Sequence, residues 1–515
     1  MMRRLLFTLL CAATLASAAA QPYRRNYAVP QLTDEVREIR RAGAWKPAST
    51  DEVTLPSSVD NSRLKYFPAV FSQQGGSCAQ SSGIRYLFTY EMNRLRDLDA
   101  QASDENTYSY FYTWNFLNEG IDQGGFAEQG LNIARRQGVM SLADFPDPTF
   151  ISGYLWQSGY DKYIRAMHNR VKEIITIDAT TQEGIDQARR YLYDAGDGSE
   201  HGGILSYSAL ASGWTFDENY AGPSETGYGY LLTKLATDGA HAMTIVGYDD
   251  TVEYTSGGQT FRGAFIVVNS YGTWWGDEGR FYLPYHFFLT DREPSVLSHE
   301  FTGCRCMEYT PQVVFCVRVS YDSRNDLAFT MGVADKPYAT TPTLTLQPVI
   351  AVNQGGDHPM QGEYVDNGNT IELAFDFTEA VERYAGYSEP KYFLTVTRSE
   401  LGKLGSGTLD AFSVIDMRDP SQKREYVCDL PSPVTLAKGA NTFTIATTAL
   451  QTTSASPVSW LDSFGNALTT PFALRTAGGK YAKFAVTDYD PGAGRVTIKY
   501  LYQHDGSRNL NSLTD

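Results

Sequence analysis

Basic residues and long apolar runs are both scarce in this chain of 515 residues. Lysine and arginine together number 43 against 59 aspartates and glutamates, which gives a formal net charge of -16. Because the electrostatic field of a protein with a net negative charge repels polyanions, we expect no nucleic-acid partner. No apolar run beyond the N-terminus is long enough to cross a bilayer, so we expect no integral membrane segment in the mature chain.

The composition also lacks the features of a disordered chain. Hydrophobic residues make up 42% of the sequence and aromatic residues 13%, which is far more than disordered segments carry. At roughly 100–200 residues per domain, the length predicts two to four domains. Their cores would be large enough to fold without a disulfide framework.

The first twenty residues differ from the rest of the chain. Arg3 and Arg4 precede the apolar run 5–10, and small residues at 16–20 offer a cleavage site. This order is typical of a secretory signal peptide, here residues 1–20. We therefore expect a secreted product that is periplasmic, bound to the cell surface or extracellular.

Cysteine is rare, with six residues in the whole chain. Cys11 falls in the predicted signal peptide, and the odd number that remains predicts a free thiol in an exported protein. Four of them lie in the second half and could form two disulfides or none: Cys304, Cys306, Cys316 and Cys428. Cys78 is remote from these four.

The sequence around Cys78 combines a glycine turn with a helical pattern. Gln73, Gln74, Gly75, Gly76 and Ser77 precede the cysteine. Apolar residues then recur at intervals of three, four and seven: Ile84, Leu87, Phe88, Met92 and Leu95. The spacing predicts a buried helix that begins at Cys78, where free amide hydrogens and the helix dipole favour the thiolate. A lone cysteine in such a place is more often a small core residue.

Two later segments add a histidine and an asparagine. His241 and Ala242 open an apolar run that ends in Val-Gly-Tyr at 246–248. The apolar residues 265–268 lead into Asn269 and then into a loop rich in glycine and tryptophan, which includes Trp275. Either segment alone is ordinary, because such residues commonly start strands and form turns.

Taken in chain order, the three segments resemble the papain family of cysteine peptidases. That family has a glutamine-containing glycine loop before a cysteine-headed helix, then His-Ala with Val-Gly-Tyr, then Asn-Ser-Trp-Gly-x-x-Trp-Gly. The resemblance covers roughly residues 55–290 and includes Gly124-Gly125 as a substrate-cleft wall. It implies an α+β, two-lobed papain-like domain at 55–298, with a helical lobe and a β-barrel-like lobe. Residues 21–54 would then be a propeptide or a linker.

The resemblance also implies the roles of the site residues. Cys78 would be the nucleophile, His241 the general base and acid, and Asn269 the residue that orients the imidazole. We expect Cys78 and His241 to rest as a thiolate–imidazolium pair, with Trp275 shielding the His–Asn bond. Either Gln73 or Gln74 would complete the oxyanion hole with the backbone amide of Cys78.

The substrate-binding residues follow from the same resemblance. Gly124 and Gly125 would pair with the substrate backbone, and Ala242 would line a pocket. We expect no cofactor. We also expect no metal site, because the remaining histidines considered have no paired metal spacing: His201, His286, His299, His358 and His504.

Three departures from the family pattern leave questions open. Ala79 follows the nucleophile where tryptophan is usual, Tyr271 replaces the first tryptophan of the asparagine motif, and the glutamine loop is shortened or shifted. They motivate two alternatives to a secreted cysteine endopeptidase. One is a silenced papain-fold binding protein or adhesin, and the other is a Cys-His acyltransferase or amidase.

From about residue 300 the hydrophobic period changes to two. The alternating sets are Val313, Phe315, Val317 and Val319; Ile371, Leu373, Phe375 and Phe377; Tyr392, Leu394 and Val396; and Val496, Ile498, Tyr500 and Tyr502. With turn residues between them, they predict an all-β sandwich or jelly roll over 299–515, as one domain or two. An accessory role such as cell-surface attachment, glycan or substrate binding, or stabilisation would suit this region.

Overall fold

The structure is a computed structural model of the chain. It describes residues 30–46, 53–148, 153–289, 298–362, 368–399, 405–430, 432–447, 472–475, 481–490 and 495–503, the last three segments as backbone. The predicted signal peptide at 1–20 lies outside the described residues. Among the described residues, no helix combines the length and the apolar character that a membrane span requires.

Helices dominate the first part of the chain and strands the rest. The helices are α1 (Asp34–Ala42), α2 (Cys78–Gln80), α3 (Thr89–Arg96), α4 (Tyr110–Leu117), α5 (Ala127–Arg136), α6 (Tyr160–Met167), α7 (Gln182–Tyr193), α8 (His286–Leu289) and α9 (Val381–Tyr384). The strands of the first sheet are β1 (Ser58–Asp60), β2 (Asn169–Asp178), β3 (Leu205–Leu210), β4 (Thr215–Asp217), β5 (Leu231–Lys234), β6 (Ala240–Ser256), β7 (Gln259–Val268), β8 (Arg280–Pro284) and β9 (Glu300–Glu308).

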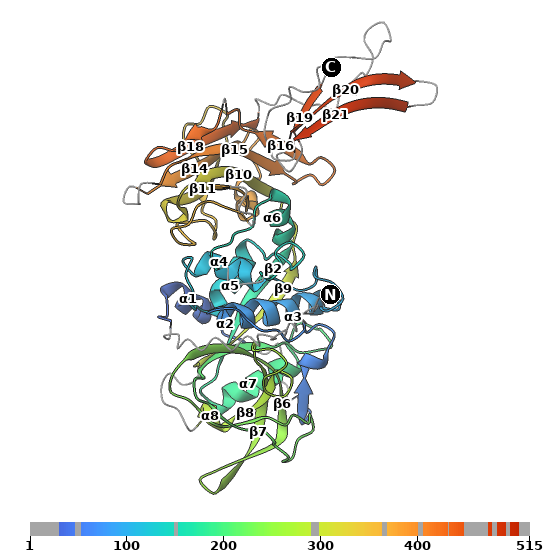
Figure 1. The fold of residues 1–515 in the computed structure, drawn as a ribbon, viewed down its shortest axis with the longest axis vertical. Helices are drawn as coiled ribbons and strands as arrows, with labels where there is room; N and C mark the ends of the chain where they lie inside the picture. The colour runs from blue at the N-terminus through green and yellow to red at the C-terminus, as the bar shows by residue number, and fades with distance from the viewer. Residues whose placement is uncertain are drawn as a thin grey trace, which may run out of the picture.

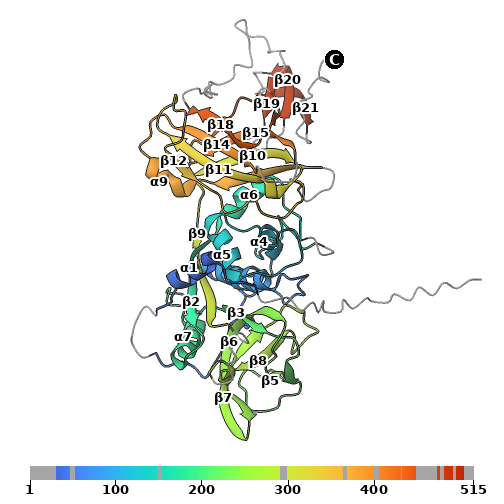
Figure 2. The ribbon, with the colours of Figure 1, turned by 90° about the vertical axis from the view of Figure 1, so that its left-hand side faces the viewer.

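The remaining strands form three further sheets. They are β10 (Val313–Tyr321), β11 (Leu327–Ala334), β12 (Leu344–Leu346), β13 (Thr370–Asp376), β14 (Lys391–Arg398), β15 (Gly407–Asp416), β16 (Arg424–Val427), β17 (Val434–Thr435), β18 (Gly439–Ala446), β19 (Phe472–Arg475), β20 (Tyr481–Asp490) and β21 (Arg495–Gln503). Figures 1 and 2 show α1 to α5 in the middle of the molecule, with β3 to β8 on one side and β10 to β18 on the other.

The first sheet has the strand order β2-β9-β3-β6-β7-β8-β5-β4, and β1 pairs with β6. This sheet is open in the described part of the chain, which corrects the expected β-barrel-like lobe. Strand β6 pairs with β1, β3 and β7, so it brings the start of the domain and its two later motifs together. Because β9 pairs with β2 and β3, residues beyond 298 share this sheet. The predicted domain limits themselves stay a prediction.

The helix predicted at Cys78 is present as one continuous helical segment. It begins with α2, passes through the π-helical stretch Ser81–Phe88 and continues as α3. The predicted apolar residues are fully buried as far as Met92, whereas Leu95 is 45% exposed. The prediction is wrong at Leu95 because the segment reaches the surface there and ends at Asp97, whose φ of 55° is left-handed.

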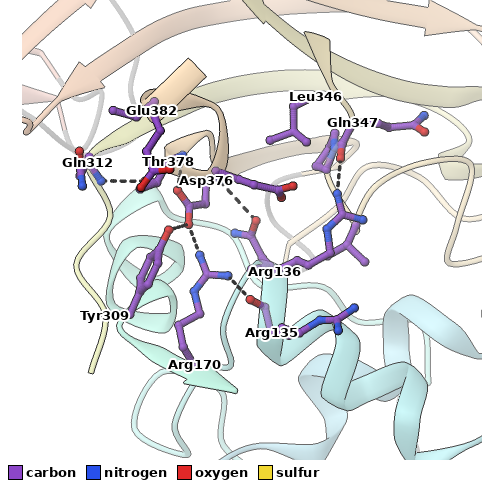
Figure 3. Close-up of a pocket in the computed structure, with 15 residues that line it drawn as sticks. Arg135, Arg136, Arg170, Tyr309, Gln312, Leu346, Gln347, Asp376, Thr378 and Glu382 are labelled. Carbon is purple, nitrogen blue, oxygen red and sulfur yellow. Dashed lines mark hydrogen bonds and ion pairs between the residues drawn. The ribbon is translucent and has the colours of Figure 1, made fainter. Parts of the chain in front are cut away.

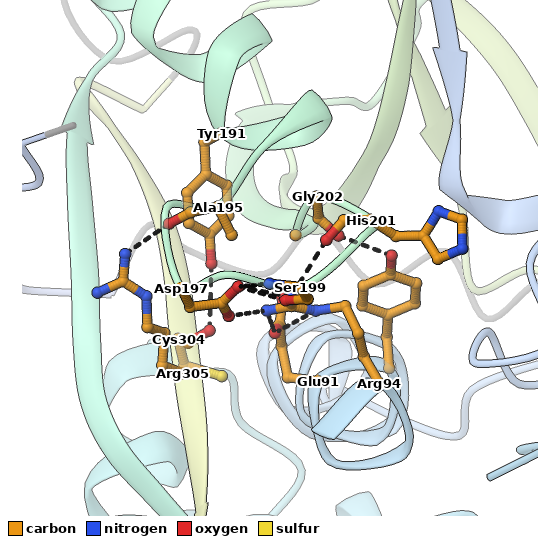
Figure 4. Close-up of polar contacts among 12 residues, drawn as sticks. Glu91, Arg94, Tyr191, Ala195, Asp197, Ser199, His201, Gly202, Cys304 and Arg305 are labelled. Carbon is orange, nitrogen blue, oxygen red and sulfur yellow. Dashed lines mark hydrogen bonds and ion pairs between the residues drawn. The ribbon is translucent and has the colours of Figure 1, made fainter. Parts of the chain in front are cut away.

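A buried ionic cluster fixes this helical segment to the loop before β3. Figure 4 shows Arg94 of α3 between Glu91 and Asp197, with Ser199 beside them. Arg94 donates to Glu91 at 2.6 Å and to Asp197 at 2.7 Å. Burial raises the pKa of Glu91, and the neighbouring Arg94 opposes that rise. The cluster therefore ties the helices to the sheet at the far end of the segment from Cys78.

The strands predicted beyond residue 300 are present. The four alternating sets lie on β10, β13, β14 and β21, with Phe377 just after β13. One sheet has the order β13-β10-β15-β16 with β17 on β15, and the other β12-β11-β14-β18. Phe329 and Phe375 join the two sheets with ring centroids 5.2 Å apart. We call the described residues of 309–447 the C-terminal β-region; its assignment as a sandwich or jelly roll stays a prediction.

The segment predicted as a propeptide or linker is packed against the domain in its described part. Val36 and Ile39 of α1 are buried. Arg40 forms ion pairs with Glu128 and Glu300, each at 2.7 Å. The Glu128 side chain is only 2% exposed, so its charge depends on Arg40 for a partner.

We expect Arg40→Ala to lower the free energy of unfolding by about 3 kcal/mol, because it leaves the Glu128 carboxylate buried without its cation. Arg37→Ala is the matched control, since Arg37 pairs with an exposed Asp34 on the same helix and surface pairs contribute about 0–1 kcal/mol. Urea unfolding of the two variants measures the difference. Equal stabilities would contradict the importance of the Arg40–Glu128 pair.

Candidate active site

Three elements carry the predicted catalytic residues. Cys78 is the first residue of α2, His241 is the second residue of β6, and Asn269 follows the last residue of β7. Because β6 and β7 pair with Thr244 opposite Val268, His241 and Asn269 lie at the same end of the two strands. The strand pairing thus brings together two residues that are far apart in the sequence.

The imidazole and the carboxamide are joined by a hydrogen bond. His241 Nε2 donates to Asn269 Oδ1 at 2.8 Å, and both residues are buried, at 6% and 1% exposure. The same oxygen accepts the backbone N–H of Ser270 at 2.7 Å, which fixes the carboxamide. A neutral imidazole that donates through Nε2 has Nδ1 free as a proton acceptor. The bond therefore selects the tautomer that can act as a base.

Cys78 packs against the residue that follows the histidine. Cys78, Ala79 and Ala242 form a small buried apolar cluster, in which Cys78 retains 9% exposure. The helix head and the start of β6 are thus in contact at the position where the two motifs were expected to meet. Ala242 and Ala79 also place backbone amides near the thiol, where they oppose the effect of burial on its pKa.

The protonation of this pair is set mainly by burial. Burial raises the pKa of the Cys78 thiol, against the smaller opposing effect of nearby backbone amides. Burial lowers the pKa of His241 to about 4, against the opposing hydrogen bond to Asn269. Both shifts favour the neutral forms. They oppose the expected thiolate–imidazolium resting pair, because desolvation disfavours each charge.

Tyr271 covers the imidazole. Its ring stacks on His241 with centroids 4.7 Å apart and an interplanar angle of 17°. Trp275 contacts Tyr271 edge-on, with ring centroids 5.8 Å apart, so it lies behind the residue that covers the histidine. The family pattern predicts that Trp275 shields the His–Asn bond, and Tyr271 is a departure from that pattern. The position of Tyr271, two residues after Asn269, is the sequence signal that could have identified it.

The two glutamines point in different directions. The Gln73 Oε1 accepts from Ser270 Oγ at 2.5 Å, and its backbone N–H donates to Ser270 O at 2.8 Å. Gln74 instead donates through Nε2 to the carbonyl of Pro148 at 2.6 Å. Only Gln73 is therefore held beside the residues that follow β7.

The glycine wall lies beside the loop that precedes Cys78. Asp122 Oδ1 accepts the backbone N–H of Gly76 at 2.6 Å. A Cβ added at Gly124 would come 3.6 Å from the Gly76 carbonyl oxygen, whereas one at Gly125 would meet Gln129. Gly124 is thus adjacent to the approach to Cys78, and Gly125 leads into α5.

The described cysteines are all free thiols, which matches the alternative without disulfides: Cys78, Cys304, Cys306, Cys316 and Cys428. Among the described residues, no group of three or more His, Cys, Asp or Glu side chains is arranged to hold a metal ion.

The comparisons with known proteins give only distant structural likenesses. No family model matches the chain, and no curated protein matches it. Xylellain, a cysteine protease from Xylella fastidiosa, is similar at 18% identity and a TM-score of 0.37, over 54% of this chain and 95% of that one. ProCathepsin B S9 from Trypanosoma congolense follows at 15% identity and a TM-score of 0.36, over 52% and 86%. Because these scores are low, only the geometry of the site bears on the function.

The buried histidine predicts a defined loss of stability in acid. The pKa of His241 in the folded protein, about 4, lies below the ordinary value of 6.5. The contribution of the neutral imidazole to the free energy of unfolding is therefore fully present above pH 6.5 and is lost as the pH falls through about 4. We expect urea unfolding at about pH 4 to show a drop relative to neutral pH that is about 3 kcal/mol smaller in His241→Gln than in the wild type. A resting imidazolium would give the opposite sign, and an equal drop in both proteins would contradict the burial of a neutral imidazole.

Proposed function

We propose that this protein is a secreted, papain-like cysteine endopeptidase that hydrolyses peptide bonds in polypeptides through Cys78, His241 and Asn269. The observation that carries the proposal is the buried bond from His241 Nε2 to Asn269 Oδ1, with Cys78 against Ala242. In this arrangement Nδ1 is the free acceptor of the imidazole, and Cys78 packs against the residue that follows the histidine. A nucleophile, a base and an orienting group are the parts that acyl transfer requires.

The reaction starts from the neutral pair. As the Cys78 sulfur attacks the scissile carbonyl carbon, its proton passes to His241 Nδ1, and the imidazolium is stabilised by the Asn269 oxygen. The imidazolium then gives that proton to the departing amine, which leaves a thioacyl-enzyme. A water molecule next loses a proton to His241 and attacks the thioester, and the thiol is regenerated when the acid product leaves. Tyr271 limits the access of water to the His–Asn bond throughout.

Charge on the substrate oxygen needs donors that already point at it. The backbone N–H of Cys78 and the side-chain amide of Gln73 are the donors that we assign. Gln73 is supported by its bonds to Ser270, which hold it on the histidine side. Its Nε2 donates to the Gly75 carbonyl at 2.9 Å and would exchange this partner for the oxyanion.

The substrate binds as an extended strand beside Gly124 and Gly125. Bare backbone offers main-chain hydrogen bonds, which carry little information on side-chain sequence. Ala242 is small and lies next to Cys78, so it leaves room for a substrate side chain. The wall thus favours a broad range of peptides over one short motif.

Cys78→Ala is expected to lower peptide hydrolysis by at least about 10³-fold without a change in the unfolding curve, because the nucleophile is lost and a small residue replaces a small one. Cys428→Ala is the control, since Cys428 lies in the C-terminal β-region. Labelling with a thiol-directed peptidyl epoxide should occur in the control and not in Cys78→Ala. Neither labelling nor cleavage by the wild type would favour the silenced binding protein, and labelling with amide exchange alone would favour the acyltransferase.

Gln73→Ala is expected to lower kcat by about 10²-fold with little change in KM, because the donor acts mainly on the transition state. Gln74→Ala should change kcat by less than about threefold, since its side chain is held at Pro148. Steady-state kinetics on one peptide amide compares the two. A larger loss in Gln74→Ala would reverse the assignment of the oxyanion donor.

A further inference from the structure

The C-terminal β-region touches the loop that carries the glycine wall. We call residues 118–125 the wall loop. His358, from the segment between β12 and β13, donates through Nε2 to the carbonyl of Gly120 in this loop at 3.2 Å. Its ring also stacks on Tyr154, with centroids 5.1 Å apart and an interplanar angle of 22°. One histidine thus contacts both the wall loop and the chain beside it.

Two glycines let the segment approach this closely. A Cβ added at Gly356 would lie 2.1 Å from the Glu119 carbonyl oxygen, and one at Gly355 would lie 2.5 Å from the Trp156 ring. Both glycines have positive φ, at 77° and 80°. The contact with the wall loop is therefore backbone against backbone, and a side chain at either glycine would push the two segments apart.

Arg324 anchors the same segment to the rest of the C-terminal β-region. It is 1% exposed and donates to the carbonyls of Pro359 and Gln361, each at 3.0 Å. It also donates to the carbonyl of Tyr154, and its guanidinium lies over Trp156 at 4.2 Å from the ring centroid. Arg324 thus holds the segment that carries His358 both to the C-terminal β-region and to the chain around Tyr154.

The wall loop connects the contact with His358 to the residues just before Cys78. Gly120 N–H donates to Asn118 Oδ1 at 2.9 Å, which closes the start of the loop. Further along, Asp122 accepts from Gly76, two residues before Cys78, and Gln123 O accepts from Trp114 Nε1 at 2.9 Å. The loop is therefore held at one end by His358 and at the other by the residues that lead into Cys78.

The C-terminal β-region also contacts the preceding part of the chain away from the wall loop. A pocket there has a volume of about 710 Å³. Figure 3 shows Arg170 of β2 beside Asp376 of β13 in this pocket, and Tyr309 donates to the same carboxylate. Gln137 donates there to the Ala374 carbonyl at 2.9 Å. Gln137 directly follows the last residue of α5, and none of these residues belongs to the wall loop. They join the two regions without reaching the substrate cleft.

We propose that His358 is a positioning residue through which the C-terminal β-region holds the wall loop in register with Cys78, and so sets the affinity for the peptide residues that precede the scissile bond. The inference rests on the proposed function, because it assigns the wall loop to that part of the substrate. It gives the C-terminal β-region a role in peptide binding by the cleft itself, beyond attachment.

The test uses the full-length chain and two peptide amides, one with three residues before the scissile bond and one with a single residue. We expect His358→Phe, which keeps the stack on Tyr154 and removes the donor, to raise KM for the longer peptide about five- to tenfold, with kcat within about twofold. KM for the shorter peptide should not change. His358→Gln, whose amide reaches the position of Nε2, should restore the wild-type KM.

Gln137→Ala is the matched control from the same boundary, expected to lower stability while leaving both KM values unchanged. An unchanged KM in His358→Phe, an equal rise for both peptides, or the same rise in Gln137→Ala would each overturn the inference while wild-type cleavage stands. If the wild type neither cleaves the peptides nor takes a peptidyl epoxide on Cys78, the proposed function fails, and this inference fails with it.

Discussion

One buried hydrogen bond, between the imidazole of His241 and the carboxamide of Asn269, organises the candidate active site. It decides which ring nitrogen carries the proton, and therefore which one can receive a proton from a thiol. The bond exists because β6 and β7 pair in a register that places the start of β6 beside the end of β7. Burial then makes it costly to break, since either partner would be left without a hydrogen bond.

The residue types and the order of the site could be predicted from the sequence. Cys78 follows a glycine turn, His241 lies at the start of an apolar strand and Asn269 directly follows another, and each of these signals is local. The same holds for β10, β13 and β14 of the C-terminal β-region, where a period of two suffices. The open sheet could not be predicted in this way, because strand order depends on pairings between distant segments.

The directions of the side chains could not be predicted from the sequence. Gln73 and Gln74 are neighbours with the same chemistry, and only the tertiary contacts with Ser270 and Pro148 separate them. The pKa shifts of Cys78 and His241 arise mainly from desolvation, which a motif does not contain. No sequence signal identifies the role of His358, because Gly120 lies 238 positions away from it in the chain. The chain joins the wall loop to the C-terminal β-region through contacts that only the folded structure displays.

The most direct test of the central claim is to trap the thioacyl-enzyme. The protein would be mixed with an activated peptide ester, quenched in acid within the first turnover, digested, and mapped by mass spectrometry. We expect the acyl portion of the substrate on the fragment that contains Cys78, and its loss in Cys78→Ala. An acyl group on another residue, or turnover with no acylated fragment, would contradict it.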